Sequence, residues 1–364
     1  MDFLKVLRKL IYARTSNYVR HATFVEGTLK GGSGPFKCLF VEDSALLKYV
    51  SVTAYESPPD IIKTNRILIK NLRKIIRNAT KDTDMCVALL PLGHEVGFDD
   101  IIHFKAQEWV HQILDISSPW EKIKERFHKN PKETMRKIRK YNLTYRISHD
   151  ISDFELFYYQ MFLPLIRKQY GNSAYTDTYQ EMKEYFDKGF LLIVMDGDNP
   201  VSGGLCWAKD DIMIFRRVGV LNGDKNYIKN GAQSAVYQFI ISYSKENNFR
   251  KVDLMKSRSF LDDGVYITKR EWGAATYVDD EADSWMHIFI LRHSENVARF
   301  FEYNPLVIHT KQGLRGLVGW SGPGVLSKEN EKALSRKYYS PGLSGLSLIM
   351  PESGTITELP FKDS

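Results

Sequence analysis

Residues 210–273 end in the cluster Gly264-Val-Tyr-Ile-Thr-Lys269-Arg-Glu-Trp272-Gly273. Upstream of the cluster, the apolar pattern predicts a strand over 212–221 interrupted by Gly219, a helix over 232–246 that follows Gly231, and a strand over 251–255. A strand, a helix that begins at a glycine and a second strand form the rhythm of an α/β layer. This order limits the fold and the function more than any other part of the chain.

The composition indicates a chain with two folded domains. Its 364 residues, 43% hydrophobic and 13% aromatic, suffice for two cores of roughly 100–200 residues each. The longest apolar runs, such as 190–195, are far shorter than the roughly 20 residues that cross a bilayer. No charged and then apolar leader ends at a small-residue cleavage site. We therefore expect a soluble, cytoplasmic protein.

The net charge indicates which partners the protein binds, and the spacing of its Cys and His residues bears on metal sites and disulfides. A net charge of +7 and an isoelectric point near 9.0 favour anionic partners, such as nucleic acid, nucleotide-bearing ligands or an acidic membrane surface. Cys38, Cys86 and Cys206 lie in apolar segments without Cys-x-x-Cys spacing, and the nine histidines show no metal-ligand spacing. We expect neither a metal site nor a disulfide framework.

The first 24 residues carry an amphipathic pattern. Phe3, Leu7, Leu10 and Ile11 recur at helical spacing among lysines and arginines, which predicts a short basic helix. Two interpretations remain open. The helix docks on the core with its cations in solvent, or it adsorbs to an anionic membrane and makes the protein peripheral to the inner face of the cell membrane.

The remaining chain alternates predicted strands and helices. Strands are expected over 37–42, 46–53, 84–90, 109–116 and 143–147, with three more within 190–221; helices are expected over 64–78, 153–169 and 177–188. The paired runs 37–42 and 46–53 suggest a hairpin. The last segment, 321–364, is rich in Gly, Ser and Pro, and we expect a loosely packed tail there.

A basic helix is predicted after Asn130-Pro131, where Asn130 is expected to cap the helix and Glu133 to complete a capping box. Its exposed face would carry Lys132, Arg136, Lys137, Arg139 and Lys140. Cations at i, i+4 repel each other by a few tenths of a kcal/mol per pair, roughly, unless an anion lies between them. The face is either simply solvated or binds an anionic donor or substrate through Arg136, Arg139 and Lys140.

Forming an amide requires a gripped acyl donor, hydrogen-bond donors for the developing oxyanion, and an amine that attacks unprotonated. Gly219 marks either a bulge, where N–H groups of Val218, Gly219 and Val220 face a carbonyl oxygen, or merely a twist in the strand. Gly231 and Ala232 at a helix start either hold a phosphate or serve ordinary capping. These five residues are our candidates for donor binding.

The cluster at Lys269 supplies the candidates for catalysis. The stem of Lys269 should pack beside Trp272 while its ammonium offsets negative charge in a cleft, unless Arg270 is the inward cation. Asp253 either orients that cation or is a satisfied core carboxylate. Tyr266 is a candidate hydroxyl donor. Arg216 and Arg217 should point to opposite strand faces, so one of them, with Arg217 as our candidate, should reach the cleft.

Four segments together resemble a known family. They are 118–147, which contains Asn130-Pro-Lys-Glu-Thr-Met-Arg-Lys-Ile-Arg-Lys140, then Asp196-Gly-Asp-Asn-Pro-Val-Ser-Gly-Gly204, Lys251-Val-Asp253-Leu, and the cluster 264–273. In order and spacing they resemble the FemABX-like branch of the GNAT superfamily over about 118–275, while 24–117 is similar only in element order. Ile228 stands where the usual GNAT pyrophosphate signature has Gln or Arg.

The resemblance implies a fold. It implies an α/β (α+β) chain with two tandem GNAT-like domains, each a mixed, mostly antiparallel sheet flanked by helices. The first domain would span 25–117, the second, with the active cleft, 118–285, and a return segment, 286–320, would pack on the first. The resemblance places Lys269 at the reaction centre, and we group Asp253 and Tyr266 with it.

The resemblance also implies an activity. The chain would be an N-acyltransferase that moves an aminoacyl or acyl group from aminoacyl-tRNA or an acyl thioester to an amine of a cell-envelope, glycan or peptide precursor, nucleotide- or lipid-linked. No cofactor would be bound permanently; acyl-CoA or aminoacyl-tRNA would be a co-substrate of a monomer or homodimer. The alternative is a non-catalytic nucleic-acid- or membrane-surface-binding protein that retains the fold.

Overall fold

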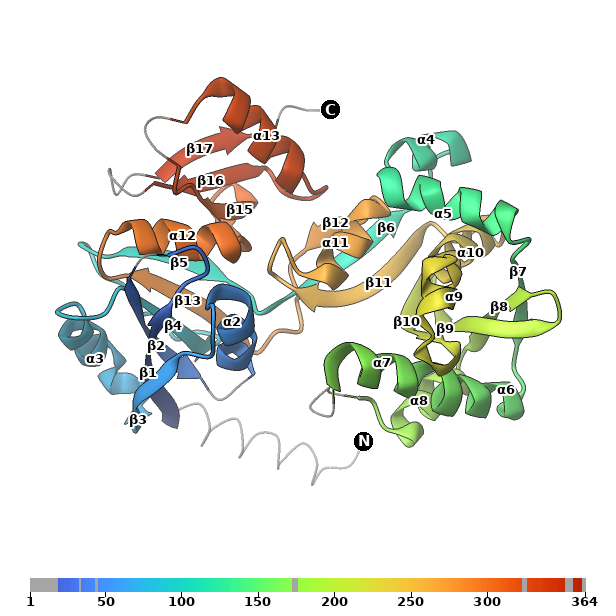
Figure 1. Cartoon of the computed structure of the whole chain (residues 1–364), viewed down its shortest axis with the longest axis horizontal. Coiled ribbons are helices and arrows are strands. Elements are labelled where there is room, and N and C mark those ends of the chain that lie inside the picture. Colours follow the sequence, from blue (N-terminus) through green and yellow to red (C-terminus); the bar gives the residue numbers. More distant parts are fainter. Residues whose placement is uncertain are drawn as a thin grey trace. The chain divides into compact units, whose positions relative to one another are not determined.

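The computed structural model describes residues 19–32, 34–42, 45–171, 176–322, 326–350 and 356–361. The chain divides into two compact units (Figure 1). The first contains the described residues up to Val110, together with Ser257–Ile267 and the chain from Tyr277 on, and the second contains His111–Lys256 and Thr268–Thr276. Each unit has its own mixed sheet flanked by helices, so the expected α/β fold class is confirmed.

The first unit is built on a ten-stranded sheet in the order β17-β16-β15-β14-β5-β13-β4-β2-β1-β3. The strands are β1 (Val19–Thr28), β2 (Pro35–Glu42), β3 (Asp60–Leu68), β4 (Met85–Pro91), β5 (Ile102–Ala106), β13 (Ser284–Ile290), β14 (Leu306–Thr310), β15 (Gly313–Gly319), β16 (Gly345–Ile349) and β17 (Ile356–Pro360). Helices α2 (Leu46–Ala54) and α12 (Glu295–Tyr303) pack on one face, and the turn η1 (Ile69–Asn71) with α3 (Leu72–Ala79) packs on the other.

The second unit holds most of a seven-stranded sheet in the order β12-β6-β11-β10-β9-β8-β7. Its strands are β6 (Trp109–Asp115), β7 (Thr144–Ser148), β8 (Phe190–Asp196), β9 (Asn199–Lys209), β10 (Ile212–Val220), β11 (Lys251–Arg258) and β12 (Ala275–Tyr277). Most neighbours run antiparallel, but β10 and β11 are parallel because a helical crossover connects them.

Helices cover both faces of the second sheet. They are α4 (Trp120–Glu125), α5 (Lys129–Lys140), α6 (Ile151–Leu156), the π-helix η2 (Phe157–Phe162), α7 (Leu163–Tyr170), α8 (Tyr179–Phe186), the turn η4 (Leu221–Gly223), α9 (Lys225–Lys229) and α10 (Ala232–Glu246). Helices α5 and α10 lie together over one face (Figure 1), and η2 with α8 packs on the other. Helix α11 (Gly264–Glu271) carries residues of both units.

Several predicted elements were wrong in type or position. Residues 46–53 form helix α2 because Leu46, Val50 and Ala54, four apart, bury one stripe against the core. Residues 60–68 form strand β3, the edge partner of β1, so strand pairing overrides the helical spacing read over 64–78. Helix α5 begins at Lys129, and the side chain of Asn130 donates to the Glu271 carboxylate instead of capping.

The two ends of the chain also differ from expectation. A helix was predicted over residues 1–24. Residues 1–18 lie outside the described residues, and residues 19–24 belong to strand β1, which pairs with β2 on one side and β3 on the other. The segment 321–364 is not a loosely packed tail in its described part. It forms α13 (Lys328–Tyr338), then β16 and β17. All five residues of β16 are buried, and Leu346 and Leu348 pack into a hydrophobic core. The Gly and Ser content of the segment gave no sign of this core.

The boundaries between the units differ from the predicted ones. The chain rejoins the first unit at Tyr277, before residue 286, and it visits that unit earlier through Ser257–Ile267. Among the described residues, no helix is both long enough and apolar enough to cross a membrane.

Candidate active site

The central feature of the second unit is an opening between two parallel strands. Strand β10 pairs with β9 as far as Val220, but it pairs with β11 only where Ile212–Ile214 meet Lys251–Asp253. A register shift between Phe215 and Arg217 marks a bulge just beyond this contact. In the described chain, β10 beyond Ile214 therefore has no strand neighbour on its β11 side. We call this opening the strand fork.

Helix α10 begins beside the far end of the fork. The hydroxyl of Ser202 donates to the carbonyl of Ala232 at 2.7 Å, and Ser202 pairs with Val220, the last residue of β10. Gly231 precedes the helix with a φ of 93°, a conformation that favours glycine, and no side chain caps the helix. The N–H groups of the first turn, with the positive end of the helix dipole, thus lie at the end of β10.

The second glycine singled out from the sequence, Gly219, allows a close approach of a helix. A Cβ at this position would lie 2.7 Å from the Cβ of Met161, which belongs to the π-helix η2. The bulge in β10 lies at Arg216 rather than at Gly219. Of the expected donor-binding residues, the structure therefore brings Val218, Gly219 and Val220 to the fork on β10 and Gly231 and Ala232 to its far end.

A histidine and a carboxylate meet where the fork opens. Asp253 is the last β11 residue paired with β10, and its Oδ1 lies 2.8 Å from Nε2 of His111 on the neighbouring strand β6. The two atoms are close but not aligned for a hydrogen bond, and the same Oδ1 accepts from the backbone N–H of Met255 at 2.7 Å. Met255 has a φ of 64°, unusual for a non-glycine residue, so the backbone of β11 departs from extended geometry there.

The pair is partly open to solvent. The side chain of His111 is 24% exposed and that of Asp253 13%. Both lie on the sheet face opposite α10, since their neighbours Val252 and Leu254 pack with that helix. An imidazole beside a carboxylate is a common arrangement for a general base. Sequence reasoning missed His111 because only the pairing of β6 with β11 brings it to Asp253, 142 positions further along the chain.

Lys269 is buried, with 4% of its surface exposed. Its ammonium donates to the carbonyls of Met255 at 3.0 Å and Lys256 at 2.9 Å, so Lys269 connects helix α11 to this irregular part of β11. This contact gives Lys269 a structural role next to Asp253. A role in the reaction itself stays a prediction.

Replacing Lys269 by methionine should destabilise the second unit by about 2–3 kcal/mol, because two buried carbonyls lose a charged donor. Hydrogen exchange of β11 peptides during a urea titration measures this, with Lys251→Met, an exposed site on the same strand, as the control. Unchanged stability together with lost turnover would contradict the structural role and support the reaction-centre role.

Tyr266 lies in the core of the first unit. It is fully buried, and its hydroxyl donates to the hydroxyl of Ser340 at 3.0 Å. This placement gives Tyr266 a packing role, and its expected role in catalysis stays a prediction.

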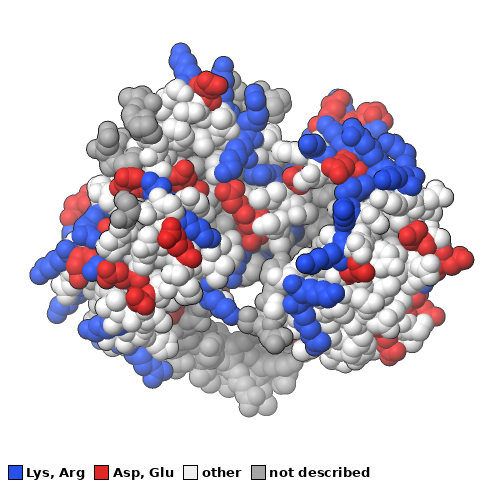
Figure 2. All heavy atoms as spheres, in the orientation of Figure 1, with Lys and Arg blue, Asp and Glu red and all other residues white. Residues whose placement is uncertain are grey.

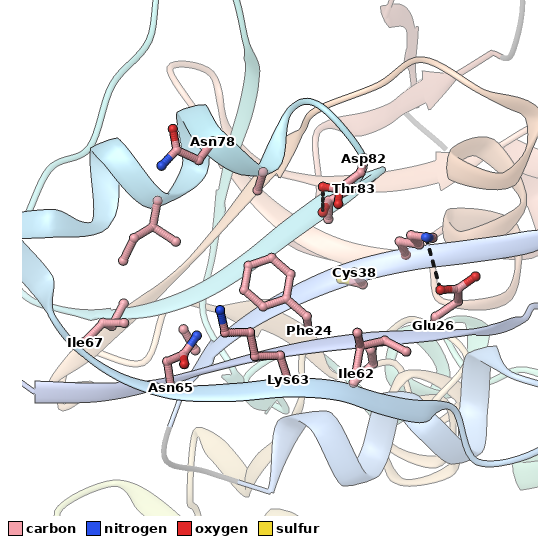
Figure 3. Close-up of a pocket in the computed structure, with 15 residues that line it drawn as sticks. Phe24, Glu26, Cys38, Ile62, Lys63, Asn65, Ile67, Asn78, Asp82 and Thr83 are labelled. Carbon is pink, nitrogen blue, oxygen red and sulfur yellow. Dashed lines mark hydrogen bonds and ion pairs between the residues drawn. The ribbon is translucent and has the colours of Figure 1, made fainter.

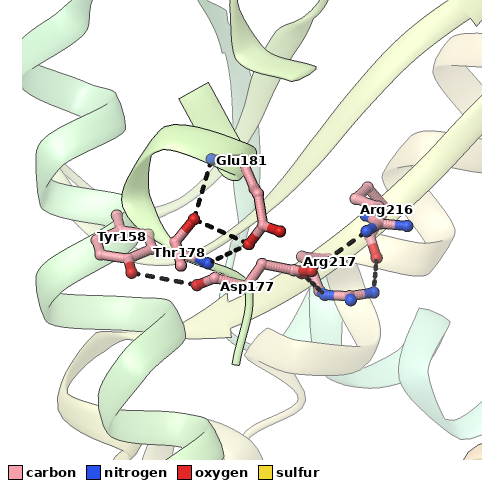
Figure 4. A network of polar contacts seen from close by, with 6 residues as sticks. All are labelled: Tyr158, Asp177, Thr178, Glu181, Arg216 and Arg217. Atoms are coloured by element: carbon pink, nitrogen blue, oxygen red, sulfur yellow. Dashed lines mark hydrogen bonds and ion pairs between the residues drawn. The ribbon is translucent and has the colours of Figure 1, made fainter. Parts of the chain in front are cut away.

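The two adjacent arginines of β10 bind one carboxylate. The bulge brings both side chains to Asp177, with Arg216 Nη2 at 3.2 Å from Oδ1 and Arg217 Nε at 2.5 Å from Oδ2 (Figure 4). The expectation that they point to opposite strand faces was wrong, because the extra residue of a bulge changes the alternation. Arg217 is therefore engaged by Asp177, whose side chain is only 3% exposed.

The contacts of Asp177 with Arg216 and Arg217 stabilise the loop that precedes α8. The backbone carbonyl of Asp177 accepts from the hydroxyl of Tyr158 at 3.2 Å, and the next residue, Thr178, forms a capping box with Glu181 at the start of α8 (Figure 4). Arg216 also lies over the ring of Tyr185, 4.7 Å from its centroid. These contacts connect the bulge at the fork to helices η2 and α8.

The predicted basic helix forms a basic surface with α4. Residues 120–140 contain nine Lys and Arg against three Glu. Lys and Arg gather over α4 and α5 in Figure 2. Arg136, Arg139 and Lys140 are exposed, as expected, while the ammonium of Lys137 lies 3.1 Å from Glu133 and its stem covers Gly231. Through that contact the basic surface adjoins the start of α10.

The first unit has a cavity of about 410 Å³ between α3 and the strands β1 and β3 (Figure 3). Phe24, Ile67 and Ile75 make its apolar wall, and Lys63 and Asn65 are among its polar residues. None of the residues expected to carry chemistry lines this cavity.

Three histidines share one face of the first sheet. His287 on β13 and His309 on β14 both pair in register with Lys105 of β5, and His103 Nε2 lies 3.0 Å from His287 Nδ1. Burial, helped by the charge of Lys105, lowers the pKa of His309 to about 4, and burial, then His103 and Lys105, lowers that of His287 to about 4. The described residues contain no group of three or more His, Cys, Asp or Glu arranged to hold a metal ion.

Acid should therefore destabilise the first unit. Between pH 6.5 and about 4 the unfolded chain takes up a proton at position 287 that the folded chain does not, so stability falls as the pH falls, by up to about 3 kcal/mol for this group. Urea midpoints measured across this range should show a smaller loss for His287→Gln than for the wild type. The exposed His293→Gln variant should keep the full loss. An identical loss in His287→Gln and the wild type would refute the assignment.

Comparison with known proteins gives likeness in structure alone. No protein-family model matches the chain, and no curated protein does either. The chain is similar in structure to FemX. The TM-score is 0.39 at 10% identity, over 79% of this chain and 92% of FemX.

Two other solved structures are also similar to this chain. The C-terminal domain of a putative lysylphosphatidylglycerol synthetase from Agrobacterium fabrum gives a TM-score of 0.34 at 7% identity, over 74% of this chain and 81% of that one. A GCN5-related N-acetyltransferase from Sphaerobacter thermophilus gives 0.31 at 11% identity, over 56% and 58%. With all of these scores below 0.5, the likenesses define no function for this chain.

Proposed function

We propose that this chain is an acyltransferase that forms an amide, moving an acyl or aminoacyl group from an activated donor to an amine. The strand fork carries the proposal. A β10 edge without a strand neighbour, the first turn of α10 at its end and the His111–Asp253 pair at its opening together meet the three demands of acyl transfer.

The donor would lie along the open edge of β10. Alternate N–H groups of Phe215–Val220 face that edge and can bind the donor and the oxyanion that develops on its carbonyl oxygen. The first turn of α10 favours an anionic part of the donor. Both features rest on backbone groups, so they set no identity for the acyl chain.

The reaction follows from this placement. The amine nitrogen forms a bond to the acyl carbon, the bond from that carbon to the sulfur or oxygen of the leaving group breaks, and Nδ1 of His111, the ring nitrogen that does not face Asp253, takes the proton that the amine loses. Asp253 stabilises the imidazolium that forms. The proton then passes to the leaving group or to solvent, which restores His111.

We propose an acyl thioester or an aminoacyl-tRNA as the donor class, following the family that the sequence resembles. The basic surface of α4 and α5, which adjoins the start of α10 at Gly231, supports a strongly anionic donor. From the same resemblance we propose an amine of a cell-envelope, glycan or peptide precursor as the acceptor.

The full-length protein should be incubated with labelled acyl thioesters and, separately, with charged tRNA, each with a pool of amines. We expect amine-dependent consumption of one donor class and an amide product by mass spectrometry. Consumption of neither class, although the donors bind, would refute the proposal.

The basic surface favours a second candidate, a non-catalytic protein that binds polyanions. In that case the logarithm of affinity for RNA should fall with the logarithm of salt by about 0.7 per phosphate contacted, and Arg136→Gln should reduce that slope by about as much. No amide would form with any donor.

A further inference from the structure

The guanidinium of Arg270 is buried and makes no ion pair or side-chain hydrogen bond among the described residues. Only 8% of its surface is exposed, and its Nε and Nη1 atoms are buried without a hydrogen bond. Burying a charged donor without a partner is unfavourable, whereas replacing it by an apolar side chain would remove that cost. A retained, unpaired guanidinium therefore indicates a ligand that completes it.

The surroundings of Arg270 are those of an anion site. Burial lowers the pKa of His128, which precedes the first residue of the twelve-residue helix α5. The nearby charge of Arg270 lowers it further, the Glu271 carboxylate opposes this effect, and Lys132 adds a smaller lowering. No side chain caps α5, so the N–H groups of Lys129 and Asn130 lie at a positive helix end. All of these residues belong to the second unit.

The carboxylate nearby is already bound. Both oxygens of Glu271 accept from the side-chain amide of Asn130, at 2.8 and 2.7 Å, and the backbone carbonyl of Glu271 accepts from the N–H of His128 at 2.9 Å. Glu271 makes no ion pair with Arg270 in the described structure. Its carboxylate thus leaves the guanidinium unsatisfied.

We propose that Arg270, His128 and Lys132 bind a phosphate group at the start of helix α5. A tetrahedral phosphate offers several acceptor oxygens to donors that converge from different elements, and a guanidinium with free N–H groups suits it. The exposed part of Arg270 is where the anion reaches the guanidinium. Binding is measured without turnover, so the inference is tested separately from the acyl-transfer proposal.

The test compares inorganic phosphate with chloride at equal ionic strength, using the full-length protein. Phosphate should raise the midpoint of thermal unfolding of the wild type. Arg270→Met should weaken phosphate binding by about tenfold to a hundredfold, the effect of losing a charge-assisted hydrogen bond. In phosphate-free buffer the variant should be at least as stable as the wild type. Arg250→Met, at a side chain 71% exposed, is the matched control and should respond like the wild type.

Two results would overturn the site. One is a wild-type response to phosphate no larger than that to chloride. The other is an Arg270→Met protein that responds like the wild type or that is less stable in phosphate-free buffer. If Arg270→Met does not fold, the imidazole resonances of His128 in the wild type decide, since phosphate must shift them and chloride must not.

The source of the phosphate is resolved by two further probes at equal phosphate concentration. A nucleoside 5′-monophosphate that competes with inorganic phosphate indicates a monoester ligand. A short oligoribonucleotide without terminal phosphates that competes instead indicates the diester backbone of a nucleic acid. Competition by neither probe would limit the site to free phosphate.

Discussion

Replacing His111 by glutamine is expected to slow amide formation by about 10²–10⁴-fold, the range for loss of a general base. Glutamine keeps a polar side chain beside Asp253 but cannot take a proton from the attacking amine. Turnover at saturating donor and amine checks this expectation, with thermal unfolding to show that the fold persists.

A matched variant separates the base from a general effect of losing a histidine. His293→Gln, at an exposed position, should turn over like the wild type. Asp253→Asn should slow the reaction less than His111→Gln does, because it removes the partner of the base rather than the base. Wild-type turnover in His111→Gln would remove this histidine from the mechanism and leave direct attack by a free amine.

Replacing Asp177 by asparagine is expected to destabilise the second unit by about 3–5 kcal/mol. Two arginines, with side chains 19% and 29% exposed, would lose the carboxylate that joins them, and their like charges would repel each other. The loop before α8 would lose its attachment to the bulge of β10 at the same time. Urea titration followed by hydrogen exchange of peptides from β8, β9 and β10 reports the effect for this unit alone.

The control for this variant is an exposed ion pair. Asp187→Asn removes the partner of Lys183 from a side chain 53% exposed, and it should cost less than about 1 kcal/mol. If Asp177→Asn costs no more than Asp187→Asn, the network of Figure 4 is a surface feature and does not hold the fork.

Elements whose apolar residues have a single consistent period were predictable. Helix α10 spans the expected residues 232–246, β4 differs from the predicted strand by one residue at each end, and β6 differs by one residue at its carboxyl end. In these segments burial of one face or of the whole strand is the dominant energy, so the local pattern and the tertiary structure agree.

Where the sequence pattern suits either a helix or a strand, or suggests no element at all, the neighbouring strands in the sheet decide the structure. Ile67 and Leu68 suit the helix expected over 64–78, but pairing with β1 places both in the edge strand β3. Strand β16 is hidden among glycines and serines, and it is buried because β15 and β17 flank it. An isolated pattern contains no information about which neighbour supplies the second half of the hydrogen bonds.

The sequence by itself determined the α/β layering, the order of strand, helix and strand around Gly219 and Gly231, and the basic character of residues 120–140. Only the tertiary structure brought His111 to Asp253, turned Arg216 and Arg217 toward one carboxylate, and buried Arg270 without a partner. The period of the apolar residues and the composition indicate which face of a helix or strand is buried. Contacts between distant segments depend on strand pairing, bulges and crossovers, where one residue of register decides what a side chain meets.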